Sequence, residues 1–413
     1  MADQDLKALL QRMERTRVNR RGFLAGSSLA ATSAFLAACA GGGTASSAPS
    51  GAASSAPSSA PSAAASAAAS AGASVAPAPS YATEGALFMY NWADYVDLEN
   101  IEEFKKRYNI AEFTYDTFAS NDELLTKLQG GATGLYDVGA PTAEFVPAMI
   151  DQGFIQKIDW SKVPNQALIN PQFKKLWWDP NDEYQLPKDW GTTGIAIRTK
   201  VVTEEVKTWK QFFEVAPKYS GRIVVVNSPG DVFVAPLKSL GFSLNSTNPD
   251  ELEQARQLLL GLAPHVLALD SDTYDQKLRT EEAVLGLTWT GGVAELRDEA
   301  ETADTVYQIP EDGTLYWMDT WVIFADPPHP EAAHAWLNFI HEPDIQARET
   351  VTNRYATPND EAKKLVPQEI LDDPTVFVPQ EVFDAGLLEG AQDLSTDPIR
   401  VAIWEEFSSK IGG

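Results

Sequence analysis

The chain has very little cysteine, histidine and basic charge. One cysteine and four histidines among 413 residues exclude an internal disulfide and leave no metal-ligand spacing, so we expect neither a metal site nor a cofactor. Lys and Arg number 32 against 58 Asp and Glu, which gives a formal net charge of −26. This excess of acids argues against a nucleic-acid partner, because phosphates need basic side chains, and it permits a cationic ligand.

Long hydrophobic runs are also missing, and the N-terminus has the composition of an export signal. Six basic residues and three acids in residues 1–39 precede a short segment rich in Ala, Gly and Ser. The segment is too short and too mild for a stable transmembrane helix. Arg20-Arg21 ahead of Phe23-Leu24 resembles a twin-arginine signal, although the residues do not decide between that route and general secretion.

The single cysteine closes a short motif. Leu36-Ala37-Ala38-Cys39 resembles a bacterial lipobox, in which the cysteine is lipidated and becomes the mature N-terminus. The alternative is an unprocessed buried cysteine. Cleavage before Cys39 would leave a charge of about −29.

Residues 40–84 lack the composition of a folded segment. From 40 to 80 the chain is Ala, Ser, Gly and Pro except for Thr44 and Val75, with no charge and no large apolar group to bury. We expect a disordered tether that spans on the order of 35 Å. A lipid and this tether would hold an exported domain in the periplasm or at the outer face of the cytoplasmic membrane.

Residues 87–95 predict a strand that leads into an aromatic and acidic loop. The apolar first half reads as a buried strand, and the second half carries Trp92, Asp94 and Tyr95. A helix follows with Asp97 as its N-cap and with Leu98, Ile101 and Phe104 on one face. Ligands bind after strand ends in open α/β sheets, and rings with a carboxylate suit an organic cation. The plainer interpretation is core aromatics beside a solvated acid.

The same alternation of strands and helices continues along the chain. Strands are expected at 113–118 and 136–140, a capping box at Ser120 and Glu123, and a helix capped by Thr142. This order predicts a parallel sheet covered by helices. Further strands are expected at 191–198, 222–227, 266–269, 284–289 and 313–325, and helices at 209–215, 232–240, 250–262, 331–340, 344–350 and 399–409.

Rings and acids recur at the ends of these strands. Single cases could be ordinary N-caps or core aromatics, but the repetition in two α/β halves favours a shared cleft. We expect the histidines 329, 334 and 341, on or beside one late helix, to be surface residues. The recurring groups are Trp92 with Asp94, Asp231, Ser271 with Asp272, Trp289, and Trp317 with Asp319.

Seven segments in this order carry a resemblance to a known family. They are Tyr-Asn-Trp-Ala-Asp-Tyr at 90–95, Ser-Asn-Asp-Glu at 120–123, Tyr-Asp-Val at 136–138 running to Pro141, Trp-Gly-Thr-Thr-Gly at 190–194, Asp-Val-Phe at 231–233, Trp-Met-Asp at 317–319 and Thr-Pro-Asn at 357–359. Over nearly all of 86–411 the chain resembles the extracytoplasmic spermidine/putrescine-binding proteins of ABC transporters.

The resemblance implies an α/β fold of the two-lobed periplasmic-binding-protein kind, type II-like, with a ligand cleft between lobes joined by crossing strands. The lobes would be residues 85–191 plus about 319–363, and 192–318 plus about 364–413. The implied function is a monomeric substrate-binding lipoprotein that captures polyamines by lobe closure and delivers them to a membrane permease. Such a protein is not an enzyme.

The resemblance also implies a set of site residues. Two departures leave the choice of polyamine open: Ser228 stands where spermidine-type members have Asp, and Gly292 where putrescine-type members have a second acid. Glu144 falls where some members have a tyrosine. The implied ligand-binding residues are Trp92, Asp94, Tyr95, Thr142, Glu144, Asp231, Ser271, Trp289, Trp317, Asp319 and Tyr355.

Two other functions compete with this one. The same fold could bind another small organic cation, a sugar or an amino acid. A secreted glycosidase would also use carboxylates beside tryptophans, although the chain has no nucleophile elbow, metal motif or phosphate-binding glycine loop.

Overall fold

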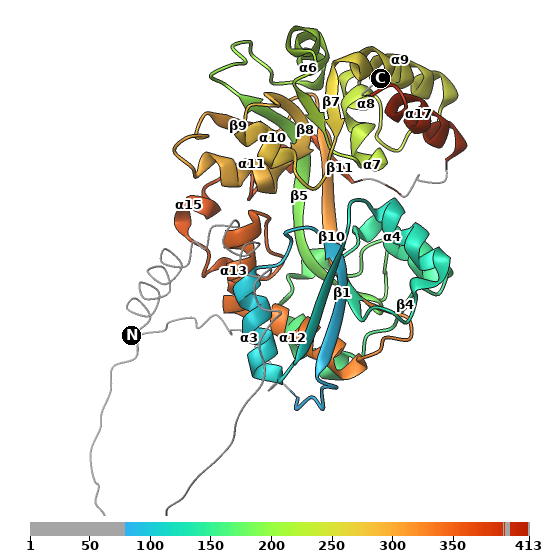
Figure 1. The fold of residues 1–413 in the computed structure, drawn as a ribbon, viewed down its shortest axis with the longest axis vertical. Coiled ribbons are helices and arrows are strands. Elements are labelled where there is room, and N and C mark those ends of the chain that lie inside the picture. The colour runs from blue at the N-terminus through green and yellow to red at the C-terminus, as the bar shows by residue number, and fades with distance from the viewer. Residues whose placement is uncertain (1–78, 391, 393–396, 412–413) are drawn as a thin grey trace, which may run out of the picture. The chain divides into compact units, whose positions relative to one another are not determined.

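Two long antiparallel strands, β5 (Gln185–Arg198) and β10 (Thr314–Phe324), run through the middle of the fold (Figure 1). The computed structural model describes residues 79–390, 392 and 397–411. The predicted signal, Cys39 and the predicted tether up to residue 78 lie outside the described residues. The other strands are β1 (Ala86–Trp92), β2 (Glu112–Phe118), β3 (Val138–Gly139), β4 (Ile155–Gln156), β6 (Ile223–Val225), β7 (Val266–Leu269), β8 (Leu285–Trp289), β9 (Thr305–Gln308) and β11 (Leu388–Gly390).

The strand order explains how two halves share one sheet. The order is β2-β1-β3-β10-β5-β8-β6-β7, with β4, β9 and β11 paired off this path. In the first half β1 pairs in parallel with β2 and β3, and in the second half β6 pairs in parallel with β7 and β8. The predicted parallel pairing is confirmed, and β5 and β10 cross antiparallel from one half to the other.

Helices follow most strands, as the alternation predicts. Several bounds differ: the strand expected at 191–198 begins at Gln185, and the helix expected at 232–240 is broken into two. The helices are α3 (Leu98–Tyr108), α4 (Asn121–Lys127), α5 (Val146–Asp151), α6 (Trp209–Val215), α7 (Pro229–Val232), α8 (Val234–Ser239), α9 (Pro249–Leu262), α10 (Tyr274–Arg279), α11 (Thr290–Arg297), α12 (Pro330–Ile340), α13 (Pro343–Asn353), α14 (Asp360–Lys363), α15 (Gln368–Leu371), α16 (Gln380–Asp384) and α17 (Pro398–Ser408).

The helix α3 begins where the sequence predicts. The Asp97 carboxylate accepts hydrogen bonds from two backbone amides of the first turn, which are otherwise left without partners at a helix start. Ile101 and Phe104 are buried against the core. The prediction for Leu98 was wrong: this side chain is 61% exposed, because it lies in the first turn, on the side away from the sheet.

The core passes through both halves of the sheet. One continuous cluster of buried side chains includes Leu87 and Phe104 from the first half and Val224 and Leu259 from the second. The described residues accordingly belong to one compact unit. Trp321 and Trp336 are buried completely and stack edge to face at 5.7 Å, which fixes α12 against β10.

The prediction of surface histidines was wrong. His334 and His341 are buried and His329 is half-buried, because residues 332–340 of α12 are buried on every side. Backbone carbonyls satisfy the imidazoles: Nδ1 of His334 lies 2.7 Å from the oxygen of Pro330, and Nε2 of His341 lies 2.7 Å from that of Pro187. Burial lowers the pKa of His341 to about 4.

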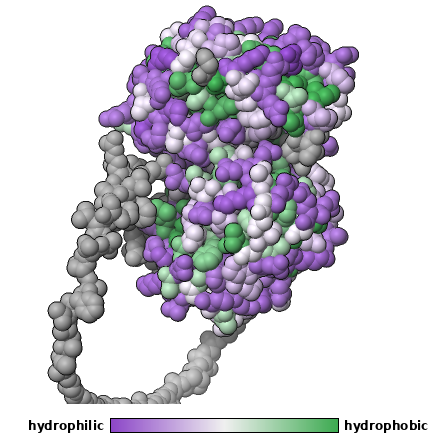
Figure 2. Space-filling view, turned by 45° about the vertical axis from the view of Figure 1, so that its right-hand side comes forward, coloured by the Kyte–Doolittle hydropathy of each residue, from purple (hydrophilic) through white to green (hydrophobic). Residues whose placement is uncertain are grey.

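The surface agrees with the acidic composition. Figure 2 shows hydrophilic residues over much of the visible face of the described part, with smaller apolar patches between them. No helix within residues 79–390 and 397–411 has the length and apolar character needed to cross a bilayer.

Candidate functional site

Two carboxylates face each other across the crossing strands. Asp319 of β10 is the direct antiparallel partner of Asp189 of β5, so both side chains lie on the same face of the sheet. The Tyr95 hydroxyl oxygen lies 2.5 Å from Oδ1 of Asp189 and 2.7 Å from Oδ2 of Asp319. All three residues are buried. Tyr95, which follows β1, therefore joins a pair of acids that would otherwise repel each other.

A β-bulge brings a lysine to this pair. Asp319 of β10 pairs with Asp189, and the next residue, Thr320, pairs with Pro187. Lys188 therefore has no partner on β10 and is the extra residue of the bulge on β5. The bulge lets the Lys188 ammonium bond the neighbouring Asp189 carboxylate, although consecutive strand residues normally point to opposite faces. The same ammonium lies 3.4 Å from the ring centre of Tyr95. Lys188 is thus a buried cation next to the pair of acids.

Aromatic rings enclose this group. The Trp317 ring meets Tyr355 edge to face at 4.9 Å, and Tyr355 meets Tyr95 in the same way at 5.8 Å. Gly191 makes this packing possible, because a Cβ there would lie 2.7 Å from the Trp317 ring. The indole nitrogen of Trp317 is buried without a hydrogen-bond partner among the described residues.

Thr142 reaches the same place from the end of β3. Its predicted role as a side-chain cap was wrong: the hydroxyl makes no capping bond to the short helix η2 (Ala143–Phe145). The Asn121 amide holds it instead, donating to the hydroxyl at 2.8 Å and accepting from the backbone amide of Thr142 at 3.0 Å. Thr142 forms an isolated β-bridge with Asp319, so it lies directly beside that carboxylate.

Burial sets the electrostatics of Asp319. Its carboxylate is taken out of water and lies opposite Asp189, and these two causes raise its pKa to about 7, while the Tyr95 and Thr142 hydroxyls and Lys188 oppose the shift. The buried oxygen Oδ1 has no well-formed hydrogen bond within the described residues. A carboxylate oxygen in this state is a place where an ammonium group would be stabilised.

A second buried acid lies at the start of α7. Oδ1 of Asp231 accepts from the Trp289 indole at 3.0 Å and from the Thr193 hydroxyl, and Oδ2 accepts from the Ser228 hydroxyl at 2.6 Å. Burial raises the pKa of Asp231, and these three neutral donors oppose the shift. No ion pair to this carboxylate forms among the described residues.

Two indoles connect the acids of the two halves. Trp92 at the end of β1 and Trp289 at the end of β8 meet edge to face, with ring centres 5.7 Å apart. Trp92 is held by its indole nitrogen, which donates to the carbonyl oxygen of Ala140 at 2.9 Å, and by the Phe118 ring at 4.6 Å. The rings therefore join the first half of the sheet to the carboxylate of Asp231.

Tyr274 packs against Gly292. A Cβ on Gly292 would lie 2.8 Å from the Tyr274 hydroxyl, which accepts a hydrogen bond from the backbone amide of Gly292 at 3.2 Å. The ring of Tyr274 also meets Trp289 at 6.2 Å. The absence of a side chain at residue 292 therefore leaves room for the Tyr274 ring beside Trp289.

Three predicted site residues, Asp94, Glu144 and Ser271, are exposed or half-buried. Ser271 accepts a hydrogen bond from the backbone amide of Asn227 at 3.0 Å, so it fixes the loop after β6. Asp94 is exposed, with a left-handed backbone (φ 51°), and its charge helps to raise the pKa of exposed Asp272. Glu144 is half-buried in the first turn of η2. The structure brings the other eight together in two groups: Tyr95, Thr142, Trp317, Asp319 and Tyr355 in one, and Trp92, Asp231 and Trp289 in the other.

Sequence reasoning missed Lys188, Asp189 and Thr193. All three belong to β5, which was expected to begin only at residue 191 because the preceding segment reads as irregular and acidic. A charged dipeptide directly before Trp190 gives no signal of a buried strand. Extending the strand back to Gln185 would have placed both charges opposite β10.

This arrangement suits binding of a cation better than metal chemistry. Within the described ranges, no group of three or more His, Cys, Asp and Glu side chains could hold a metal ion. Each of the two buried carboxylates lies beside an aromatic ring, and such rings offer π-faces to an ammonium and apolar surface to methylenes.

The comparisons with known proteins agree with this geometry. The model of the bacterial extracellular solute-binding protein family matches residues 99–378. The chain belongs to this family. A spermidine/putrescine-binding periplasmic protein of Escherichia coli is 32% identical over 326 residues, which cover 79% of this chain and 91% of that protein. A putrescine-binding periplasmic protein of the same organism is 29% identical, with 79% and 92% covered.

The fold of this solute-binding protein is also similar to that of a solved structure. A spermidine/putrescine ABC transporter substrate-binding protein from Streptococcus pneumoniae matches with a TM-score of 0.64 and 28% identity, covering 79% of this chain and 99% of that chain. The predicted fold class is confirmed: this is a two-lobed periplasmic-binding-protein fold with crossing strands. The family consists of solute-binding proteins of transporters rather than enzymes.

Proposed function

We propose that this solute-binding protein captures a polyamine, such as putrescine or spermidine, for an ABC importer. The observation that carries the proposal is Asp319: a buried carboxylate whose oxygen Oδ1 has no well-formed hydrogen bond, near the rings of Trp317 and Tyr355. A buried carboxylate is costly without a cation, and a ligand ammonium would supply one. The printed names of the relatives support the same ligand class.

The two groups of residues would hold the two ends of the ligand. Asp319 would take one ammonium and Asp231 another, while Trp92 and Trp289 would cover the methylenes between them at about 0.5–2 kcal/mol per ring. Ser228 bonds Asp231 rather than adding a second charge there. The outer end therefore offers one carboxylate, which fits one ammonium group.

Closure of the lobes would complete the site. Trp317 and Asp319 lie on the crossing strand β10, so contact with the ligand there couples binding to the relative position of the halves. The proposed lobes are residues 85–191 with about 319–363, and 192–318 with about 364–413. The closed, loaded form would then dock on the permease subunits of the transporter as a monomer.

We also propose that the protein is exported and anchored by a lipid on Cys39. The lipobox-like motif, the lack of any other cysteine and the uncharged tether support this placement. Replacing Cys39 with Ser should move the protein from the membrane fraction to the soluble fraction of the producing cells. Membrane retention of that variant would contradict the anchor.

A ligand screen tests the proposed function. Thermal shift with putrescine, cadaverine, spermidine and spermine, followed by calorimetry, should give saturable binding to at least one of them at pH 8. Glucose, glutamate and 1-butanol serve as neutral or anionic controls without the paired charges. Binding of another organic cation but of no polyamine would contradict the proposed ligand class. Turnover of a glycoside would instead support the glycosidase hypothesis.

A further inference from the structure

The contacts around Tyr95 require one proton more than the side chains hold when both acids are ionised. The phenol oxygen lies 2.5 Å from an oxygen of Asp189 and 2.7 Å from an oxygen of Asp319. Oxygens at these separations are joined by a hydrogen bond, and a phenol has a single proton to donate. One of the two contacts therefore needs a proton carried by a carboxyl group.

The neighbours of the two acids decide which one carries it. Asp189 is bonded to the Lys188 ammonium, which stabilises its ionised form. Asp319 forms no ion pair within the described residues, and its oxygen Oδ1 is buried without a well-formed hydrogen bond. The proton therefore belongs on Asp319, and the raised pKa of this group, about 7, agrees.

The other charged and titratable groups do not supply the missing charge. Glu349 of α13 is buried, and burial raises its pKa to about 7, with the Lys188 charge opposing the shift. Its carboxylate accepts hydrogen bonds from the side-chain amides of Asn100 and Asn353. Lys188 is therefore shared by several acids, and its charge offsets only part of the upward shift in the pKa of Asp319. Three further titratable groups interact with these residues. Tyr355 interacts with Asp319, His341 with Lys188, and Asp97 with Glu349.

We propose that ligand capture by this protein is coupled to proton release: Asp319 carries a proton in the free site and gives it up when an ammonium group binds, and Asp189 and Lys188 are the positioning residues that set this exchange. The inference rests on the proposed polyamine binding. The step balances, because the ligand ammonium replaces one proton as the positive charge beside Asp319 and that proton passes to solvent. The ligand amine stays protonated throughout, since alkylammonium groups titrate near pH 10.

Calorimetry with putrescine at pH 6 and pH 8, each in two buffers of different ionisation enthalpy, measures this exchange directly. For a carboxyl with a pKa of about 7, about 0.9 proton should leave per putrescine at pH 6 and about 0.1 at pH 8. The Kd should rise about tenfold from pH 8 to pH 6. Binding without proton release at pH 6 overturns the coupling and leaves the proposed function standing.

Two variants test the positioning residues in opposite directions. Asp189→Asn removes the like charge that faces Asp319, so the rise in Kd from pH 8 to pH 6 should fall below about threefold. Lys188→Met removes a nearby cation, so proton release should persist to higher pH and be measurable at pH 8. If Asp189 and Lys188 had only a structural role, the two substitutions would not shift the pH dependence of binding in opposite directions.

The matched control is Asp304→Asn, a half-buried acid that pairs with Arg198 rather than with a residue of the crossing-strand pair. Its pH profile should equal that of the unaltered protein. If either test variant fails to fold, proton release by the unaltered protein still decides the coupling. Profiles of both variants that match the control overturn the roles of Asp189 and Lys188. Absence of any putrescine binding at pH 8 would instead overturn the proposed ligand, and the coupling with it.

Discussion

The indole of Trp92 meets the indole of Trp289 edge to face at 5.7 Å, although the two residues end strands in different halves of the sheet. Trp289 also donates its indole hydrogen to Asp231, so one ring joins an aromatic contact to a buried charge. This relationship joins the two halves of the sheet within the group that surrounds Asp231. It also makes Trp289 the most informative ring to replace.

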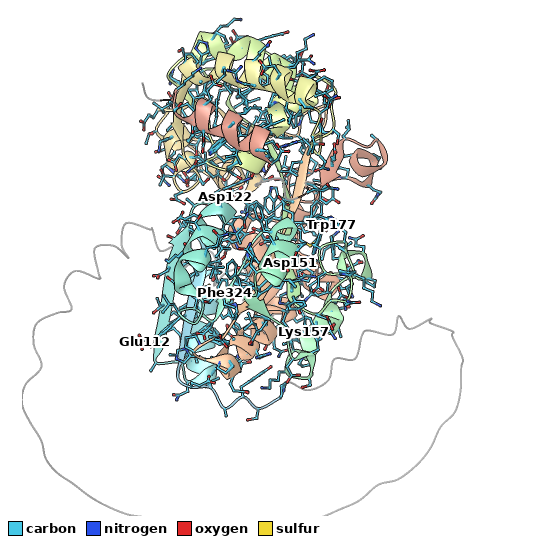
Figure 3. The ribbon with its side chains drawn as sticks, turned by 90° about the vertical axis from the view of Figure 1, so that its right-hand side faces the viewer. Glu112, Asp122, Asp151, Lys157, Trp177 and Phe324 are labelled. Atoms are coloured by element: carbon cyan, nitrogen blue, oxygen red, sulfur yellow. The ribbon has the colours of Figure 1, made fainter. Side chains whose placement is uncertain are left out.

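Trp289→Leu should weaken putrescine binding roughly thirtyfold. The change removes a π-face and one of three donors to the carboxylate of Asp231, and each loss is worth about 1 kcal/mol. Calorimetry at pH 8 measures the effect. Trp177→Leu is the matched control, because this ring, labelled in Figure 3, is 53% exposed and meets Trp178 edge to face at 5.6 Å. Equal affinities of the two variants would contradict the role of Trp289.

Asp319→Asn should weaken polyamine binding at pH 8 at least about tenfold. The amide keeps the shape of the side chain but removes the charge that the ligand ammonium needs, and breaking such a pair costs roughly 2–5 kcal/mol. The control is Asp151→Asn, an exposed acid at the end of α5 that is marked in Figure 3. An unchanged affinity by calorimetry would remove Asp319 from the site.

Gly191→Ala should destabilise the fold by about 1–3 kcal/mol and weaken ligand binding. The added Cβ would lie 2.7 Å from the ring of Trp317 and 3.1 Å from that of Tyr355, so both rings must shift. Urea unfolding measures the free energy, and near-ultraviolet circular dichroism reports the rings. Gly261→Ala in α9 meets nothing within 4 Å and should leave stability unchanged or raise it by about 0.5–1 kcal/mol. Equal stability of the two variants would show that the packing at residue 191 is not tight.

His341 should make stability fall in acid. Its folded pKa of about 4 lies below the unfolded value of about 6.5, so the unfolded chain takes up a proton first as the pH falls. The contribution is therefore present above about pH 6.5 and is lost toward pH 4, by about 3 kcal/mol.

The variant His341→Gln isolates this effect, because buried acids such as Asp319 and Glu349 titrate in both proteins. Urea unfolding from pH 7 to pH 4 should show the difference between the unaltered protein and the variant shrinking as the pH falls. A difference that stays constant over this range would mean that His341 does not titrate on unfolding.

Local sequence patterns predicted most of the helices and strands, but they predicted only some of the contacts that the site residues make. The N-caps Asp97 and Ser120 are confirmed, because a cap depends on neighbours within one turn. The predictions for Leu98 and for the histidines were wrong, because which face of a helix is buried depends on what packs against it. Thr142 was placed correctly at a helix start, but its hydroxyl is taken by Asn121, far away in the chain.

The sequence by itself determined the alternation of strands and helices, the acidic charge and the positions of rings and acids at strand ends, because these follow from composition and short periodic patterns. Only the tertiary structure decided that Asp189 faces Asp319 and that Lys188 lies between the acids. Antiparallel register and a one-residue bulge bring these side chains together, and register is set by long-range packing that no local pattern contains.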